Sequence, residues 1–262
     1  MTSPAMHIAR TGLDAQNERM RVISNNLANV NTTGFKRDRA QFASLAYQVV
    51  TQTGAPSTSE TRYAVGLNLG TGVRIQGTAR IETQGALATT GNALDLALDG
   101  DGYFQVAMPG GQIAYTRAGN LARSAEGILV TAEGYAVQPA ITIPEGAGSI
   151  TIGVDGTVSA QLPGQTQVQQ LGQIQVAIFP NPAGLQPMGD NYLLETAGSG
   201  AANIGVAGQL GRGTIRQGTL EGSNVNVVEE LVDMIETQRA YEVNSKMISA
   251  ADQMLQYVNQ NL

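Results

Sequence analysis

The sequence has 262 residues, of which 42% are hydrophobic, and its formal net charge at pH 7 is −6. This length and hydrophobic content suffice for a buried core in one large domain or two small ones. The negative charge argues against nucleic acid as a partner, because binding a phosphate backbone requires a basic field. The sequence contains no cysteine, which excludes disulfides, thiolate metal sites and thiol nucleophiles and leaves the redox compartment open.

The sequence carries no recognisable catalytic or cofactor motif. His7 is its only histidine, which excludes a site with two histidine ligands, and its position in a helical pattern is typical of a surface residue. No serine has the Gly-x-Ser-x-Gly spacing of a nucleophile elbow. Gly100 and Gly102 are followed by Gln105 where a dinucleotide-binding loop needs a third glycine. We therefore expect no enzymatic activity, no cofactor and no metal site.

The N-terminal segment has the pattern of an amphipathic helix. Ser3 can cap its start, Pro4 fits the first helical position, and the pattern ends near Asn29. Large apolar residues recur every seven positions, with two more between them, and these are Met6, Leu13, Met20, Leu27, Ile23 and Val30. We assign residues 1–34 to the N-terminal helix of a terminal helical domain.

The same segment is not a targeting signal. Its charged residues alternate with apolar ones, unlike the ordered charged, apolar and small-residue regions of a cleavable secretory signal. No stretch reaches the roughly 18 apolar residues of a membrane span. We expect no membrane insertion, and any export must occur without a cleaved signal peptide.

A connector and a β-rich middle follow the first helix. Residues 35–72 are predicted to form an extended connector, because residues 52–72 are rich in Thr, Ser and Gly and show no sustained period. Short alternating apolar runs separated by turn residues then predict a Gly-rich antiparallel β region. We expect a main β domain over residues 73–145 and 199–222, with a small β domain inserted at residues 146–198.

The C-terminal segment, residues 223–262, predicts a second long helix because it contains neither Gly nor Pro. Asn226 can cap its start, with Glu229 three positions later as in a capping box. Leu231 and a second series of residues seven apart mark its apolar face, and that series is Met234, Tyr241, Ile248, Leu255 and Leu262. The predicted fold class is therefore α+β, with two terminal helices paired in a coiled-coil-like layer.

Two interpretations of these apolar series stay open. The helices could form their own core within one chain, or they could pack against other copies of the chain. Weak helix formers favour the second interpretation, because they destabilise the first helix in isolation, and these are Asn17, Ser24, Asn25, Asn26 and Asn29.

Charged residues near the helices offer a further hypothesis. Lys36, Arg37 and Arg39 form the main basic cluster, whereas Glu229 and Asp233 lie on one face of the second helix. Each group is typical of a solvated surface. The alternative is that the basic cluster of one subunit forms ion pairs with the acidic face of another.

Four segments resemble the bacterial flagellar rod and hook proteins. Residues 24–36, reading SNNLANVNTTGFK, are similar to the N-terminal signature of that family, and residues 223–246 are similar to its C-terminal helix. Residues 98–106 and 115–119 resemble its central strand entry and the following hairpin. The matching motif residues are Asn25, Asn26, Leu27, Asn29, Gly34, Phe35, Gly100, Gly102 and Phe104.

The resemblance implies a structural subunit of a helical polymer, with the terminal helices around a central export channel and the β domains outside. Within the family, the length and the segments 47–56 and 138–144 most resemble the distal-rod members, which form a stiff tube transmitting torque to the hook. It further implies a periplasm-spanning position in the basal body and delivery by the flagellar export apparatus. The implied partners are identical subunits, proximal rod proteins, hook or hook-junction subunits, and L and P ring proteins. A proximal rod or hook subunit is the alternative within the family, and a β-rich surface adhesin is the alternative outside it.

Overall fold

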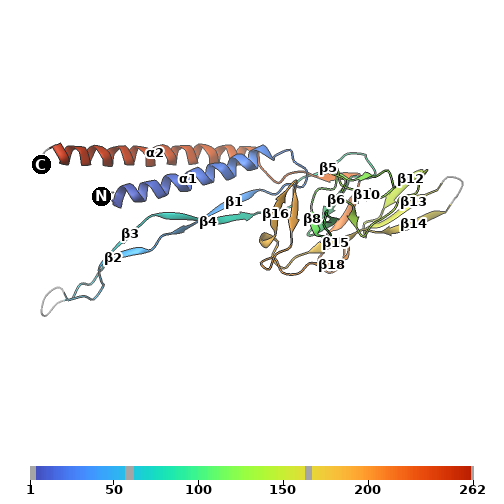
Figure 1. Cartoon of the computed structure of the whole chain (residues 1–262), viewed down its shortest axis with the longest axis horizontal. Coiled ribbons are helices and arrows are strands. Elements are labelled where there is room, and N and C mark those ends of the chain that lie inside the picture. The colour runs from blue at the N-terminus through green and yellow to red at the C-terminus, as the bar shows by residue number, and fades with distance from the viewer. Residues whose placement is uncertain (1–3, 57–61, 163–166, 261–262) are drawn as a thin grey trace. The chain divides into compact units, whose positions relative to one another are not determined.

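A long α-helix lies at each end of the chain, and antiparallel β-strands occupy the middle (Figure 1). The computed structural model describes residues 4–56, 62–162 and 167–260. Helix α1 spans Pro4–Ala28 and helix α2 spans Val227–Gln260. This arrangement confirms the predicted α+β class.

The helix ends follow the local sequence. α1 begins at Pro4 and ends at Ala28, directly before Asn29, whose carbonyl accepts a turn hydrogen bond from the Thr32 amide at 3.1 Å. At the start of α2, Oδ1 of Asn226 accepts a hydrogen bond from the Val228 amide at 3.1 Å. A side-chain oxygen in this position satisfies an amide that has no partner in the first helical turn. The structure thereby confirms Asn226 as the cap.

The chain forms two compact units, each assembled from separate stretches of sequence. The first, which we name the helical unit, comprises Met1–Leu27, Asp38–Ala79 and Asn226–Leu262. The second, which we name the β unit, comprises Ala28–Arg37 and Arg80–Val225. The chain therefore passes between the units four times.

In the helical unit, α1 and α2 lie side by side and antiparallel (Figure 1). Their contacts show this direction, since the partner's number in α2 falls as the number in α1 rises. The contacts are Gly12 with Asn244, Arg19 with Asp233, and Asn26 with Glu230.

Two antiparallel strand pairs complete the helical unit. β1 (Asp38–Ser44) pairs with β4 (Val73–Arg80), and β2 (Tyr47–Thr51) pairs with β3 (Leu67–Gly70). The predicted single extended connector over residues 35–72 is therefore wrong, because the chain doubles back on itself. Most of β4 also groups with the helices and not with the predicted main β domain. The sequence pattern missed this pairing because the partner strands are separated by a long aperiodic stretch.

The β unit is built on a sheet of seven strands in the order β16-β17-β8-β7-β15-β18, with β11 added beside β7. Its strands are β7 (Tyr103–Ala107), β8 (Ile113–Thr116), β11 (Val137–Gln138), β15 (Gln175–Ile178), β16 (Gln186–Gly189), β17 (Tyr192–Leu194) and β18 (Asn203–Val206). A three-stranded sheet contains β12 (Ser149–Ile152), β13 (Thr157–Gln161) and β14 (Val168–Gln173). The remaining pairs are β5 (Leu87–Thr89) with β20 (Thr219–Glu221), β6 (Leu96–Asp99) with β19 (Thr214–Gln217), and β9 (Ala122–Arg123) with β10 (Leu129–Val130). A short 3₁₀ helix spans Pro182–Gly184.

Residues 146–198 do not form the separate inserted domain that we expected. Their first strands, β12 to β14, make a sheet of their own, but β15 pairs with β7 and β17 pairs with β8. Backbone hydrogen bonding thus continues from the expected insertion into the expected main domain. The Gly and Pro residues that suggested a boundary are turns between strands of one unit.

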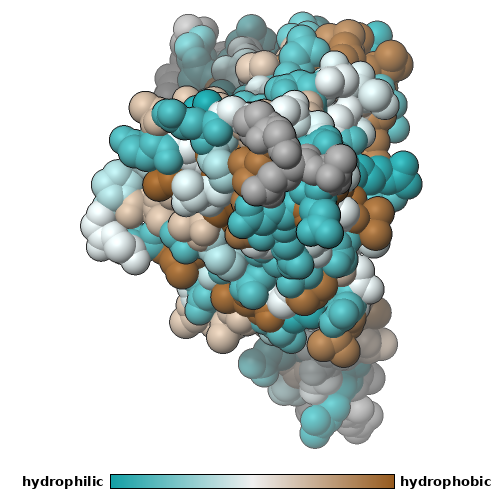
Figure 2. Space-filling model, turned by 90° about the vertical axis from the view of Figure 1, so that its right-hand side faces the viewer, coloured by the Kyte–Doolittle hydropathy of each residue, from teal (hydrophilic) through white to brown (hydrophobic). Residues whose placement is uncertain are grey.

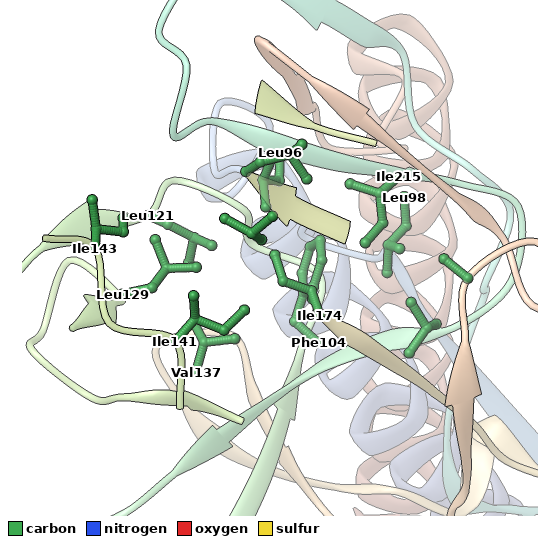
Figure 3. Packing of buried hydrophobic residues seen from close by; sticks show 14 residues of the cluster. Leu96, Leu98, Phe104, Leu121, Leu129, Val137, Ile141, Ile143, Ile174 and Ile215 are labelled. Carbon is green, nitrogen blue, oxygen red and sulfur yellow. The ribbon is translucent and has the colours of Figure 1, made fainter. Parts of the chain in front are cut away.

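One hydrophobic cluster fills the centre of the β unit (Figure 3). In strand β6, Leu96 and Leu98 are fully buried and point into this cluster with Phe104 of β7 and Ile215 of β19. The face in Figure 2 shows hydrophobic residues only as small separate patches among hydrophilic ones. Such interspersed patches are usual on a folded protein's surface.

Candidate assembly interface

Helix α2 buries almost none of its apolar side chains within the chain. Among its described side chains, Val227 to Tyr257, only Glu230 and Thr237 are buried. The large hydrophobic residues that stay exposed are Val227, Val228, Leu231, Val232, Ile235, Tyr241, Val243, Met247, Met254, Leu255 and Tyr257. Their exposed fractions range from 39% to 70%.

These residues occupy more than one face of the helix. Adjacent positions such as Leu231 and Val232, or Met254 and Leu255, differ by about 100° around a helix of 3.6 residues per turn. Exposed apolar side chains on a helix are covered where neighbours pack against it. Within its unit, α2 has one helix beside it. The exposed apolar positions of α2 are therefore candidates for contact with other molecules.

The structure places the predicted apolar series at the surface or in half-buried positions, apart from one residue. Ile23 is 4% exposed. The half-buried members are Met6, Leu13, Met20, Leu27, Val30, Met234 and Ile248, and the exposed ones are Leu231, Tyr241 and Leu255. Leu262 lies outside the described residues.

The β2-β3 ribbon is also exposed on both faces. Val49 and Val50 are adjacent in β2 and so point to opposite faces, yet their exposed fractions are 55% and 54%. In the partner strand, Leu67 is 50% and Leu69 is 48% exposed. An isolated two-stranded ribbon is marginally stable in water, so this ribbon presents a second apolar surface for contact.

Asn26, a residue of the signature segment, connects three elements of the helical unit. Its side chain is 1% exposed. Its Nδ2 donates to the Asp38 carbonyl at 2.9 Å and to Glu230 Oε2 at 3.2 Å, while its Oδ1 accepts from the Asp38 amide at 2.9 Å. A buried amide with these partners repays its desolvation. The weak helix former at this position therefore ties the end of α1 to β1 and α2.

Two motif glycines allow close backbone packing in the β unit. Gly34 has φ +70°, and a Cβ there would lie 2.7 Å from the Ala118 amide nitrogen. Gly102 has φ +137°, and a Cβ there would collide with Val176 Cγ1. Any other residue would meet both a steric clash and a disfavoured backbone conformation.

Lys36, Glu221 and Arg117 form a buried ionic group, which we name the Glu221 cluster. Their side chains are 3%, 0% and 5% exposed. Lys36 Nζ lies 2.6 Å from Glu221 Oε1, and Arg117 Nη1 lies 3.2 Å from Glu221 Oε2. The Gly85 amide donates to Glu221 Oε1 at 3.0 Å, and Lys36 Nζ donates to the Thr83 carbonyl at 2.8 Å. One carboxylate thus holds two cations from distant parts of the sequence.

Burial is the main influence on the charge of Lys36. Removal from water lowers the pKa of its ammonium group, and the hydrogen bond and charge of Glu221 oppose this effect. Arg117 contributes a smaller like-charge repulsion in the same direction as burial. The carboxylate is therefore essential, since without it two buried cations would face each other uncompensated.

Asn224 adds a second tie near the Glu221 cluster. Its Oδ1 accepts from the Arg37 amide at 2.7 Å, and its Nδ2 donates to the carbonyls of Ile81 at 2.8 Å and Thr83 at 3.0 Å. The Ile81 amide in turn donates to the Arg37 carbonyl at 2.9 Å. Three of the four passages of the chain between the units, those near Arg37, Ile81 and Asn224, are therefore hydrogen-bonded to one another.

The structure contradicts the predicted inter-subunit ion pair for Lys36, which is buried against Glu221 of its own chain. Asp233 lies 3.0 Å from Arg19 of its own chain and is partly exposed. Arg37 and Glu229 also interact with other groups in the chain, and Arg39 is exposed.

Sequence reasoning missed Glu221 and Arg117 as partners of Lys36. These three residues lie far apart in the sequence, so no local spacing connects them. One signal in the sequence could have identified Glu221, which is an isolated carboxylate in a short strand. A charged residue that is buried is almost always paired, so such a residue indicates a buried partner.

Three family models match the chain. Residues 97–160 match a model described as the flagellar hook protein FlgE/F/G D1 domain. Residues 216–261 match a model for the C-terminal region of the flagellar basal body rod FlgEFG proteins. Residues 6–36 match a model for the flagella basal body rod protein. No helix in the described part of the chain combines the length and apolar character needed to cross a membrane.

Full-length relatives extend this similarity. The flagellar basal-body rod protein FlgG of Buchnera aphidicola subsp. Acyrthosiphon pisum is 50% identical over 98% of this chain and 99% of its own length. FlgG of Caulobacter vibrioides is 48% identical over 98% of both chains, and FlgG of Bacillus subtilis is 38% identical over 94% of both. The similarity covers both units of the structure.

Proposed function

The chain belongs to the family of flagellar basal-body rod and hook proteins, which are structural components and not enzymes. From this membership we propose that the chain polymerises into the distal part of the rod. In this proposal, identical subunits form a stiff helical tube. The terminal helices pair in a coiled-coil-like inner layer around an export channel, and the β units form the outer wall. The tube transmits torque from the motor to the hook.

The observation that carries this proposal is the exposure of α2. A helix of 34 residues leaves its large apolar side chains uncovered within the chain. Each such side chain contributes about 1.5–3 kcal/mol when it is fully buried, and the entropy of ordering offsets part of this gain. Because the balance becomes favourable only when many residues are buried together, assembly is cooperative and free subunits stay soluble.

We further propose that the β2-β3 ribbon lies along adjacent subunits and resists bending of the tube. Its exposed faces, with Val49, Val50, Leu67 and Leu69, supply the apolar contact. The exposed Arg39 and the partly exposed Asp233 are candidates for ion pairs with a neighbouring copy. A variant that lacks residues 52–58 is expected to assemble into a more flexible rod. Unchanged bending stiffness, measured from electron micrographs, would contradict this role.

The proposed position is the periplasm-spanning distal rod, reached through the flagellar export apparatus without cleavage of a signal peptide. The proposed neighbours are proximal rod proteins, hook or hook-junction subunits, and the L and P ring proteins. Similarity to relatives named as basal-body rod proteins over nearly the whole chain supports this position. Immunogold labelling of isolated basal bodies should mark the segment between proximal rod and hook, whereas label on the hook or proximal rod would favour the alternative within the family.

The direct test of polymerisation is incubation of the purified full-length chain at rising concentration, followed by negative-stain electron microscopy and sedimentation. We expect tubular filaments above a critical concentration. Ile235→Glu, which places a charge on the uncovered face of α2, should abolish them without unfolding the β unit. A chain that stays monomeric at every concentration would refute the proposal.

A further inference from the structure

An apolar side chain stands at the tip of a tight turn in the β unit. Leu210 is 82% exposed. It has φ +52° and the next residue, Gly211, has φ +81°. The Arg212 amide donates to the Gln209 carbonyl at 3.0 Å, which closes a two-residue turn. Such turns favour Asn or Gly at the Leu210 position because positive φ is strained for other residues.

Hydrogen bonds from the neighbouring residues Arg212 and Gly213 hold the turn in place. Arg212 is 6% exposed, and its guanidinium donates to Asn203 Oδ1 at 2.6 Å and to the Gln209 carbonyl at 3.2 Å. The Gly213 amide donates to the Asp101 carbonyl at 2.7 Å. A strained, exposed leucine on a fixed support serves no packing purpose within the chain. Retained strain of this kind marks a functional contact.

A pocket opens beside this turn. It has a volume of about 300 Å³, and its wall includes Gly211 together with Tyr103, Ile178, Phe179 and Pro182. The apolar walls suit a leucine-sized side chain.

Two residues that line the pocket carry polar atoms without partners. Glu82 and Arg117 line it, and among the described residues neither Glu82 Oε1 nor Arg117 Nε has a hydrogen-bond partner although both atoms are buried. The first atom is an acceptor and the second is a donor. A carboxamide supplies the matching donor and acceptor in one group, and Gln209, next to Leu210 at the turn, carries a carboxamide and is exposed.

We propose that the Gln209–Leu210 turn of one copy inserts into the Tyr103–Phe179 pocket of a neighbouring copy in the polymer. Leu210 packs on the apolar wall, and the Gln209 amide hydrogen-bonds to Glu82 and Arg117. The contact joins a projection on one subunit to a pocket on the next, as the head-to-tail interfaces of helical polymers do. It rests on the proposed function, because it requires identical neighbours.

Mixed cysteine cross-linking tests the contact directly, since the chain has no cysteine of its own. One tagged full-length chain carries Leu210→Cys and a differently tagged chain carries Pro182→Cys, so that any disulfide containing both tags joins two subunits. After co-assembly and mild oxidation, we expect a dimer with both tags. Val154→Cys, at an exposed apolar position elsewhere in the β unit with an exposed fraction of 67%, is the matched control that should not cross-link to Pro182→Cys.

A second variant separates docking from folding. Leu210→Gly relieves the strained backbone, so the monomer should melt at the same or a higher temperature. Loss of the leucine contact should nevertheless raise the critical concentration of assembly about tenfold or more. Gln209→Glu should also raise it by facing Glu82 with a like charge, and the double variant with Glu82→Gln should recover part of the loss.

The outcomes distinguish this inference from the proposed function. Polymers that form normally but give no mixed cross-link, with an unchanged critical concentration for Leu210→Gly, overturn the inference and leave the proposed function standing. Cross-linking to a ring protein instead of a second copy also overturns it. If the chain forms no polymer at all, the turn has no identical neighbour and both proposals fail.

Discussion

The two units of this protein use their hydrophobic residues in opposite ways. The β unit encloses fully buried residues such as Leu98, Phe104 and Ile174 in one cluster. Among the described residues of the helical unit, the buried apolar ones are the small Ala9 and Ala15 together with Ile23, while the longer helix leaves most of its large apolar side chains exposed. The β unit therefore has the means to fold by itself, whereas the proposed function requires the helical unit to gain most of its burial from assembly.

This difference separates the residues that stabilise the subunit from those that hold subunits together. Substitutions in the β-unit core should lower the free energy of unfolding of the monomer. Substitutions on the exposed faces of α2 should leave that free energy almost unchanged and weaken polymerisation.

Removal of the central carboxylate of the Glu221 cluster should be the most damaging change to the β unit. Glu221→Ala leaves Lys36 and Arg117 buried without a counter-charge, and breaking a buried pair in this way costs about 3–5 kcal/mol. Denaturant unfolding of the monomer measures the loss. The control is the surface pair Arg216–Asp99, whose side chains are 57% and 36% exposed, where Arg216→Ala should cost no more than about 1 kcal/mol. Equal losses for the two variants would contradict a structural role of the buried cluster.

A cavity in the β-unit core should have an effect of similar or somewhat smaller size. Leu98→Ala removes a fully buried side chain and should lower the free energy of unfolding by about 2–5 kcal/mol, because it combines lost burial with an unfilled cavity. Thermal unfolding by calorimetry provides the measurement. A loss below about 1 kcal/mol would show that the core is not packed as described.

The β unit should lose stability in alkali because of its buried tyrosines. Burial, with the nearby charge and hydrogen bond of Glu82, raises the pKa of Tyr103 above the usual 10.0, and burial and Glu133 raise the pKa of Tyr192. Since the folded-state pKa is the higher one, this stability is present below pH 10 and is lost as pH rises above it. Each tyrosine contributes a slope of up to about 1.4 kcal/mol per pH unit.

Tyr103→Phe should therefore show a shallower fall in stability than the unsubstituted protein above pH 10, measured by urea unfolding at a series of pH values. Lys36, whose pKa is lowered by burial, acts in the opposite sense between that lowered pKa and 10.5. Lys36 makes the same contribution to the pH dependence of stability in both proteins, so this contribution cancels when the two profiles are compared. Identical pH profiles for the two proteins would contradict the assignment.

The smallest effect on the monomer is expected on α2. Ile235 is 50% exposed, so Ile235→Ala should change the free energy of unfolding by less than about 0.5 kcal/mol. The same substitution should raise the critical concentration of polymerisation, because the side chain is buried there. A large loss of monomer stability with an unchanged critical concentration would contradict the proposal that the exposed side chains of α2 serve assembly and not the stability of the monomer.

The sequence was sufficient to predict those features that depend on local chemistry. The start of α1 at Pro4, the cap at Asn226 and the β character of the middle all follow from nearby residues. The heptad spacing located the apolar positions of the helices, but it could not say whether they would be covered within one chain. The motif segments identified Gly34 and Gly102, and the structure supplies the reason, which is close backbone packing.

Features that depend on distant pairing were not predictable. The doubling back of β2 on β3 escaped because residues 52–66 carry no periodic signal between the two strands. The burial of Lys36 escaped because its partner Glu221 is 185 positions away. The predicted boundaries of an inserted domain were wrong for the same reason, because β15 and β17 pair with strands that precede them by many residues.

Hydrogen exchange with mass spectrometry on monomer and polymer can show whether neighbouring subunits complete the helical unit. We expect fast exchange of the α2 amides between Leu231 and Tyr257 in the monomer and slow exchange of the β6 and β7 amides. On polymerisation, α2 alone should gain protection of about 100-fold or more. If α2 in the free monomer were already as protected as β6 and β7, with no further gain in the polymer, the account would be contradicted.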